Sequence, residues 1–116
     1  MSGLFISDRY PAYFETLRMS KPFKRKRSPL FQLGVIVFTQ AVREHLELYR
    51  HDASDVLSRH VAGDWGDLPL EDARENEFAL EQPLRIFSSY EVAGQRIWVI
   101  TEADRNATTL IFPHEY

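Results

Sequence analysis

The segment that spans residues 96–113 constrains the fold most. Residues 96–102 and 108–112 are apolar runs rich in β-branched and aromatic side chains, and a polar turn at 103–107 separates them. Such runs are typical of β-strands. The first run is apolar on both faces, which predicts a central strand, and Pro113 ends the second.

A further strand and a tight turn precede this segment. Residues 84–92 alternate apolar and polar positions, as a strand with one buried face does. A two-residue turn at 93–94 would place Tyr90 opposite Ile97 in the next strand. We therefore expect the last third of the chain to form a three-strand antiparallel meander.

The middle of the chain predicts one strand and three helices. Residues 33–39 form a short β-branched run typical of a buried strand, and Thr39 is a suitable N-cap for a helix at 40–49. Two further short helices are expected, one ending at Gly63 and one over residues 69–80. The side chains expected to face inward from these three helices are Val42, Leu46, Tyr49, Val56, Leu57, Val61, Ala73, Phe78 and Leu80.

These elements predict a single α+β domain at residues 30–116. An early strand joins the three-strand antiparallel C-terminal meander, and two to four short helices pack on one face of the sheet. One more short helix, opened by Pro11, is expected at 12–19.

The composition limits the classes of protein to consider. The chain has 116 residues, the size of one domain, and no cysteine, so disulfides and thiolate metal sites are excluded. No apolar run reaches the roughly 18 residues that a membrane-spanning helix needs. The first residues lack the basic and apolar regions of a signal peptide. We therefore expect a cytoplasmic protein.

The net charge of −3 conceals two parts of opposite sign. Residues 1–30 carry seven bases and two acids, and residues 31–116 carry seven bases and fifteen acids, which gives +5 and −8. Residues 1–29 are therefore interpreted as a basic N-terminal arm that either contacts nucleic-acid phosphates or folds back onto the acidic domain. In the first case the contacting bases are Lys21, Lys24, Arg25, Lys26 and Arg27.

The acidic charge is concentrated between residues 64 and 81, where seven acids accompany a single base, Arg74. Along a turn and a helix, these carboxylates either form a solvated face or imitate spaced phosphates and occupy a basic groove on another protein. The second interpretation predicts partner-binding residues in this run and in the turn at 103–107. They are Asp64, Trp65, Asp67, Glu71, Asp72, Glu75, Glu102, Asp104 and Arg105.

The turn with Glu102, Asp104 and Arg105 has a structural and a functional interpretation. In the structural one, Asp104 accepts backbone N–H groups and Arg105 bridges to a nearby acid. In the functional one, the cluster contacts a partner or, as a weaker hypothesis, supplies the acid and base of a small nuclease-like toxin.

Motifs for metal binding and catalysis are missing from the sequence. The four histidines lack the spacing of metal ligands. The sequence contains neither a serine in a strand–turn–helix elbow nor a phosphate-binding glycine loop. We therefore expect no catalytic residue, no metal and no cofactor, and a binding protein in place of an enzyme.

Three motifs carry a resemblance to a known family. They are Gly63-Asp-Trp-Gly-Asp67, the run Asp72-Ala-Arg-Glu-Asn76, and Ile97-Trp-Val-Ile-Thr-Glu-Ala-Asp-Arg105 followed by Thr108-Thr109. In this order and spacing they resemble the small plasmid-related proteins of bacteria, some of which carry a label of type I restriction subunit. The resemblance covers about residues 30–116, and the long basic segment 1–27 departs from the pattern. It implies a mobile-element setting and no particular reaction.

The leading functional hypothesis combines the acidic run with this resemblance. The chain is expected to be a mobile-element protein whose acidic surface binds a protein partner and inhibits a host defence system that handles nucleic acid, as anti-CRISPR and anti-restriction proteins do. The alternative is a nucleic-acid-binding accessory or regulatory protein that uses the basic arm. A membrane is not an expected partner.

Overall fold

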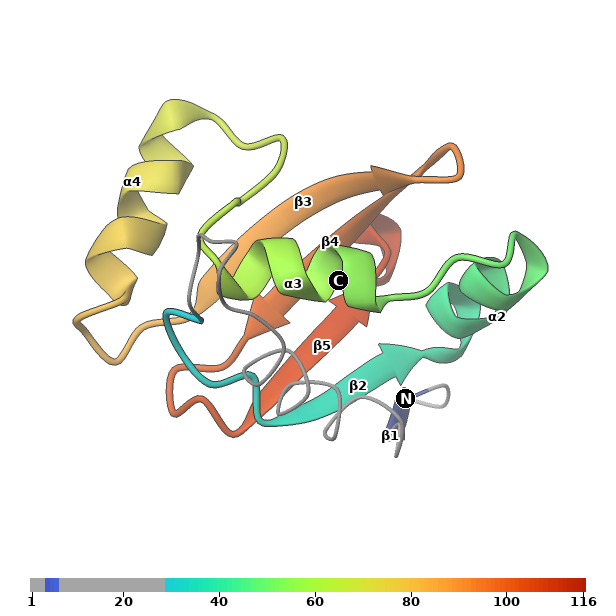
Figure 1. The fold of residues 1–116 in the computed structure, drawn as a ribbon, viewed down its shortest axis with the longest axis horizontal. Helices are drawn as coiled ribbons and strands as arrows, with labels where there is room; N and C mark the ends of the chain where they lie inside the picture. Colours follow the sequence, from blue (N-terminus) through green and yellow to red (C-terminus); the bar gives the residue numbers. More distant parts are fainter. Residues whose placement is uncertain (1–3, 7–28) are drawn as a thin grey trace, which may run out of the picture.

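The structure, a computed structural model, describes residues 4–6 and 29–116. Five strands form one mixed sheet in the order β1-β2-β5-β4-β3, and helices lie across one face and beside one edge (Figure 1). The elements in chain order are β1 (Leu4–Ile6), β2 (Val35–Thr39), α2 (Gln40–Leu48), α3 (Ser54–Val61), α4 (Leu70–Ala79), β3 (Ile86–Val92), β4 (Gln95–Thr101), β5 (Ala107–Ile111) and the 3-10 turn η2 (Pro113–Glu115).

The predicted α+β class and the carboxyl-terminal meander are confirmed. Strands β3, β4 and β5 pair antiparallel in sequence order, and Tyr90 lies opposite Ile97 as expected. Ala93 and Gly94 both have positive φ, 49° and 83°, which matches the tight turn that joins twisted antiparallel strands. Ile97 and Val99 of β4 face the core, and on the other face Trp98 packs against Phe87 and Tyr116, which explains why this strand is apolar on both faces.

One feature of the sheet was not predicted, and a second differs from the prediction. Strand β5 pairs on its other side with β2, in parallel, so the early strand joins the meander at β5. Strand β1 falls within the segment interpreted as a basic arm and pairs antiparallel with β2, so residues 4–6 belong to the sheet. The helix expected at 12–19 lies outside the described residues.

The core lies between the sheet and helices α2 and α3. Val42 and Leu46 of α2 are buried, as are Val56, Leu57 and Val61 of α3, all as predicted. The sheet contributes the facing side chains, among them Ile36, Phe38, Ile97, Val99 and Leu110. Figure 1 shows α3 lying across the middle strands of the sheet.

Two side chains expected in the core are at the surface. Tyr49 is 53% exposed because it lies just past the end of α2, where its ring packs on His45 instead of the sheet. Phe78 is 60% exposed because α4 turns Asn76 and Ala79 inward instead. Ala73 and Leu80 are only half buried, against the smaller cluster of Trp65, Ala79 and Ile86.

Thr39 caps α2 as predicted, since its hydroxyl oxygen accepts a hydrogen bond from the N–H of Val42 at 3.2 Å. The same hydroxyl donates to the carboxylate of Glu115 at 2.8 Å. That carboxylate also accepts the N–H of Phe112 at 2.9 Å. The start of α2 is thereby bonded to the carboxyl-terminal turn.

The outer edge of β3 is closed by side-chain and loop groups. The amide of Asn76 donates to the carbonyl of Phe87 at 2.6 Å and accepts its N–H at 3.0 Å, so it imitates a neighbouring strand. The loop before α4 continues this pairing, because Ser89 N–H donates to the Trp65 carbonyl and Asp67 N–H to the Ser89 carbonyl. A closed edge offers a second chain little backbone to pair with.

Replacing Asn76 by alanine leaves both backbone groups of Phe87 without partners. Because unpaired, partly buried polar groups are costly, we expect the free energy of unfolding to fall by about 2 kcal/mol. Urea denaturation measures this loss, and faster amide exchange at Phe87 locates it. The exposed neighbour Glu75→Ala serves as control and should change stability by less than about 0.5 kcal/mol. Equal stabilities for the two variants would contradict the pairing role.

Candidate partner-binding surface

The predicted partner-binding residues gather around α4, but several of them hold the fold. Asp64 forms an ion pair with Arg59 at 2.7 Å, and its carboxylate accepts the N–H of Gly66 at 3.2 Å. Its backbone carbonyl accepts the hydroxyl of Tyr90 at 2.6 Å. Gly66 has a φ of +75°, and a Cβ there would lie 2.0 Å from the Ser89 carbonyl oxygen. Asp64 therefore shapes the loop that enters α4.

Trp65 belongs to the core and not to the surface. It is only 6% exposed, packs with Ala79 and Ile86, and stacks at 6.4 Å on Phe31. Its indole N–H donates to the carboxylate of Glu77 at 3.0 Å. The expectation that this ring contacts a partner is wrong, because α4 and β3 cover it.

The acids of the run divide into a paired and an unpaired set. Asp64 and Asp67 pair with arginines, Asp67 with Arg96 at 2.9 Å, and Glu77 accepts from Trp65. In the described part of the chain, no ion pair or hydrogen bond engages the remaining carboxylates, and all four are exposed. We call them the acidic surface; they are Glu71, Asp72, Glu75 and Glu81.

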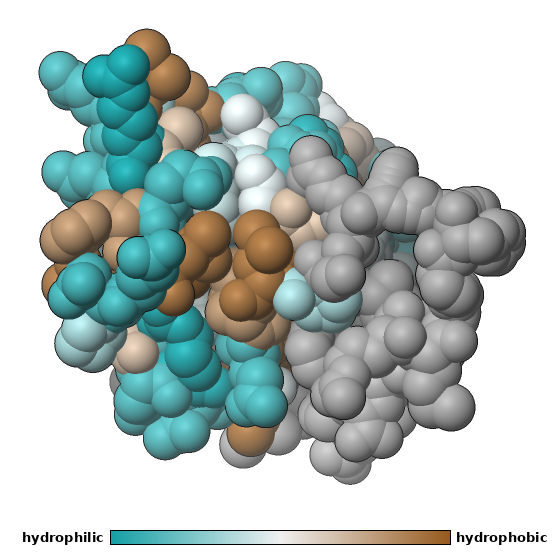
Figure 2. All heavy atoms as spheres, turned by 60° about the vertical axis from the view of Figure 1, so that its left-hand side comes forward, coloured by the Kyte–Doolittle hydropathy of each residue, from teal (hydrophilic) through white to brown (hydrophobic). Residues whose placement is uncertain are grey.

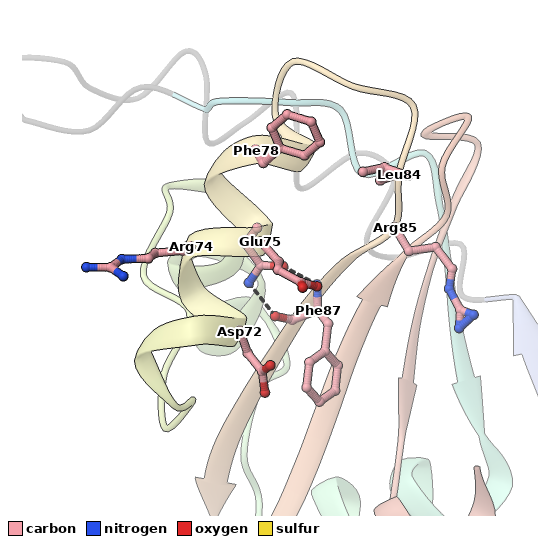
Figure 3. A pocket seen from close by; sticks show the side chains of 8 residues that line it. Asp72, Arg74, Glu75, Phe78, Leu84, Arg85 and Phe87 are labelled. Carbon is pink, nitrogen blue, oxygen red and sulfur yellow. Dashed lines mark hydrogen bonds between the residues drawn. The ribbon is translucent and has the colours of Figure 1, made fainter.

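An open groove of about 600 Å³ adjoins the acidic surface, between α4 and β3. Its lining includes three large apolar side chains: Phe78 and Leu84 stand at one end, and the ring of Phe87 lies at the other (Figure 3). Charged side chains make up most of the rest of the lining. Asp72 and Glu75 line it from the side of the helix. Figure 2, which brings the α4 side forward, shows apolar side chains at the surface between hydrophilic ones.

The two arginines that border the groove do not neutralise these acids. Arg74 extends away from the groove on the outer side of α4, and Arg85 extends away on the far side (Figure 3). The guanidinium of Arg85 donates to the hydroxyl of Tyr116 and lies 5.6 Å from its ring centre. The carboxylates of Asp72 and Glu75 therefore give the groove a negative side.

The turn at 102–105 has the structural role foreseen for it, with a different partner for the arginine. Asp104 accepts the backbone N–H of Asn106 at 2.9 Å and its side-chain amide at 3.0 Å, as expected. Arg105, at a φ of +62°, forms no ion pair with an acid of the described residues. Its guanidinium donates to five backbone carbonyls, those of Ala79, Gln82, Leu84, Glu102 and Ala103, at 2.5–3.4 Å.

These five bonds form what we call the Arg105 clasp. Carbonyls at the end of a helix lack partners within the helix, and a guanidinium in a fixed plane can satisfy several of them. The clasp fixes the end of α4 and Leu84 against the turn between β4 and β5. The clasp thereby joins the acidic run at 64–81 to the turn that carries Glu102, Asp104 and Arg105. Glu102 is exposed in this turn.

A buried polar chain under α3 was not found from the sequence. His60 is fully buried, and its Nδ1 and Nε2 lie 2.5 Å and 2.8 Å from the hydroxyls of Ser88 and Thr101. Thr101 bonds to Thr108 at 2.7 Å, and Thr108 donates to the carbonyl of Leu33 at 2.7 Å. Nothing in the spacing of these residues indicates that they meet, because each comes from a different element.

The direction of the hydrogen bonds in this buried polar chain fixes the tautomer of the His60 imidazole. A carbonyl can only accept, so Thr108 donates to Leu33 and accepts from Thr101, which in turn accepts from Nε2–H of His60. Burial, and secondly the positive charge of Arg105, lowers the pKa of His60 to about 3. Burial also raises the pKa of the Tyr90 hydroxyl. His60 and Ser88 are both wholly enclosed, so no substrate reaches this pair in the structure.

Comparison of the chain with protein-family models, with curated proteins and with solved structures finds no match. The resemblance to plasmid-related proteins therefore stays a prediction. Among the described residues, no three histidine, aspartate or glutamate side chains converge as metal ligands. No helix in the described ranges is both long and apolar enough to cross a membrane. The predicted nucleic-acid-binding bases, Lys21, Lys24, Arg25, Lys26 and Arg27, lie outside the described residues.

The clasp predicts a local effect of replacing Arg105 by lysine. An ammonium group keeps the charge but cannot reach five carbonyls, so we expect a loss of about 2 kcal/mol in the free energy of unfolding. Amide exchange should quicken in α4 and stay slow in α2. Arg96→Lys, at a surface ion pair, is the control and should cost less than about 1 kcal/mol. Uniform quickening in both helices would argue against a clasp specific to α4.

The buried imidazole predicts a loss of stability in mild acid. The unfolded chain protonates His60 near its ordinary pKa of 6.5, whereas the folded chain resists protonation down to about 3. The stabilisation of the folded chain by neutral His60 is therefore complete above pH 6.5 and is lost as the pH falls from 6.5 towards 3. Between pH 7 and 5 we expect a fall of about 2 kcal/mol from this group.

Urea denaturation at pH 7, 6 and 5 measures this dependence. His60→Gln is the matched variant, since its side-chain amide keeps one donor and one acceptor but does not titrate. Its free energy of unfolding should change less over this interval. Parallel curves for the two proteins would show that His60 does not carry the effect.

Proposed function

We propose that this protein acts by binding and that its acidic surface docks onto a basic, nucleic-acid-handling site of a partner protein. The observation that carries the proposal is the division among the acids of residues 64–81. Those that hold the fold are paired, whereas Glu71, Asp72, Glu75 and Glu81 are exposed and no contact in the described structure uses them. Charges without a structural role are available to a partner.

The setting of the acids favours a protein partner. Three of them lie on one helix that the Arg105 clasp and Asn76 hold in place, so their spacing is fixed before binding. Preformed charge speeds encounter with a surface of opposite sign and selects among partners. The groove beside them adds apolar surface, which supplies affinity that charge alone does not.

We infer further that the partner belongs to a host defence system that handles nucleic acid, which would make the protein an anti-CRISPR or anti-restriction inhibitor encoded on a mobile element. This part of the proposal is supported by the resemblance to plasmid-related proteins and by the small acidic domain. Inhibition requires only that a basic groove be covered, and no bond is made or broken.

A second candidate is a nucleic-acid-binding accessory or regulatory protein. It is supported by the opposite charges of residues 1–30 and 31–116, +5 and −8. In this case the bases between Lys21 and Arg27 would contact phosphates, and binding would weaken steeply with added salt.

Charge reversal tests the first candidate. The triple variant Glu71→Lys, Asp72→Lys and Glu75→Lys should lose the proteins that the wild-type chain captures from its host cell, identified by mass spectrometry. The captured partner should be released from the wild-type chain by added DNA, because the two compete for one site. The control is Glu44→Lys, Glu47→Lys and Glu91→Lys, an equal charge change on other elements. Equal capture by both triple variants at low salt would exclude the acidic surface.

A direct titration separates the two candidates. Fluorescence anisotropy with labelled DNA and RNA should show no binding to the full chain if the acidic surface carries the function. Salt-sensitive binding that disappears on deletion of residues 1–27 would support the regulator instead.

A further inference from the structure

We propose that the groove between α4 and β3 binds a short stretch of the partner protein in which an apolar side chain stands next to lysine or arginine. This inference deepens the proposed function and depends on it, because it names the chemistry that the acidic side of the molecule recognises. The groove contributes an apolar recess, and the carboxylates of Asp72 and Glu75 contribute the negative side.

The apolar part of the recess is open to a ligand. Phe78 and Leu84 are 60% and 46% exposed, and both line the groove, as does the half-buried ring of Phe87. Exposed large apolar side chains that share one recess are typical of a binding surface. A volume of about 600 Å³ lies in the range of natural ligand sites, roughly 300–1,000 Å³.

The charge at the groove selects a cationic neighbour for that apolar side chain. Asp72 and Glu75 have no ion pair among the described residues, and Arg74 and Arg85 extend away from the recess (Figure 3). A lysine or arginine beside the inserted side chain would pair with these carboxylates close to apolar surface, where ion pairs are worth more than in bulk water.

The floor of the groove excludes binding by strand addition. The outward backbone groups of Phe87 are taken by Asn76, and those of Ser89 by the loop of Trp65 and Asp67. A partner therefore cannot extend the sheet at this edge through its own backbone. Recognition has to come from side chains that enter the recess, which makes the sequence of the partner segment decisive.

The proposal is tested with three synthetic peptides on the full chain. The first has a phenylalanine between two pairs of lysines, the second has serine in place of the phenylalanine, and the third has glutamates in place of the lysines. Nuclear magnetic resonance follows the side-chain amide of Asn76 and the backbone amide of Phe87 on the floor of the groove. We expect saturable shifts of both signals with the first peptide only.

Matched variants assign the binding to the groove. Phe78→Ser should weaken the binding of the first peptide by about tenfold. Leu70→Ser, at a 66% exposed position on the same helix outside the groove, should leave this binding unchanged. The pair Asp72→Asn and Glu75→Gln should weaken it, and Glu71→Gln should have little effect.

The outcomes separate this inference from the proposed function. Equal binding of the phenylalanine and serine peptides, or no shift at Asn76 and Phe87, overturns the groove proposal and leaves the acidic surface to be judged by charge reversal. Peptide binding that survives in Phe78→Ser overturns it as well. Selective binding in the groove together with unaltered capture by the charge-reversed triple variant would sustain the groove site and remove the proposed function.

Discussion

The guanidinium of Arg105 is the constraint on which the acidic side of the molecule depends. Helix α4 buries only Asn76 and Ala79, so apolar packing alone cannot hold it against the sheet. Five carbonyl bonds from Arg105 and the two bonds of Asn76 replace that packing. Backbone carbonyls accept the Arg105 bonds, so Glu71, Asp72 and Glu75 of the helix take no part in fixing it, whereas Glu77 accepts the indole N–H of Trp65. The helix can therefore be rigid and still keep its outward charges available.

Acidic residues have two uses in this chain, and position separates them. Before α4, Asp64 and Asp67 pair with arginines on neighbouring elements and hold the loop that covers the edge of β3. Within and after α4, the four residues of the acidic surface face outward. A domain that placed all its acids in ion pairs would present a neutral surface. The separation of the two sets leaves four exposed carboxylates beside an apolar recess, and the proposed recognition of a partner depends on this combination.

Local patterns predicted the parts of the fold whose cause is local. The opposition of Tyr90 and Ile97 follows from a two-residue turn, and the cap at Thr39 follows from one hydroxyl three residues before its donor. No pattern within either strand predicts the parallel pairing of β2 with β5. The hydrogen bonds of His60 were likewise not predicted, because their hydroxyl partners are distant in the sequence. Phe78 was misplaced because α4 is held by polar bonds, so its apolar residues do not mark its buried side. The density of acids in the sequence indicated the exposed carboxylates of the acidic surface, but the groove beside them follows only from the packing of α4 on β3.

The place of β5 in the sheet has a consequence for how the chain acquires its structure during synthesis. This strand lies between β2 and β4, yet among the five described strands it is the last in chain order. Until residues 107–111 emerge, β2 lacks its parallel neighbour, and the hydroxyl of Thr108 that completes the chain to Leu33 is missing. From the order of the strands we therefore expect the core between β2 and β4 to form only after residues 107–111 have been synthesised.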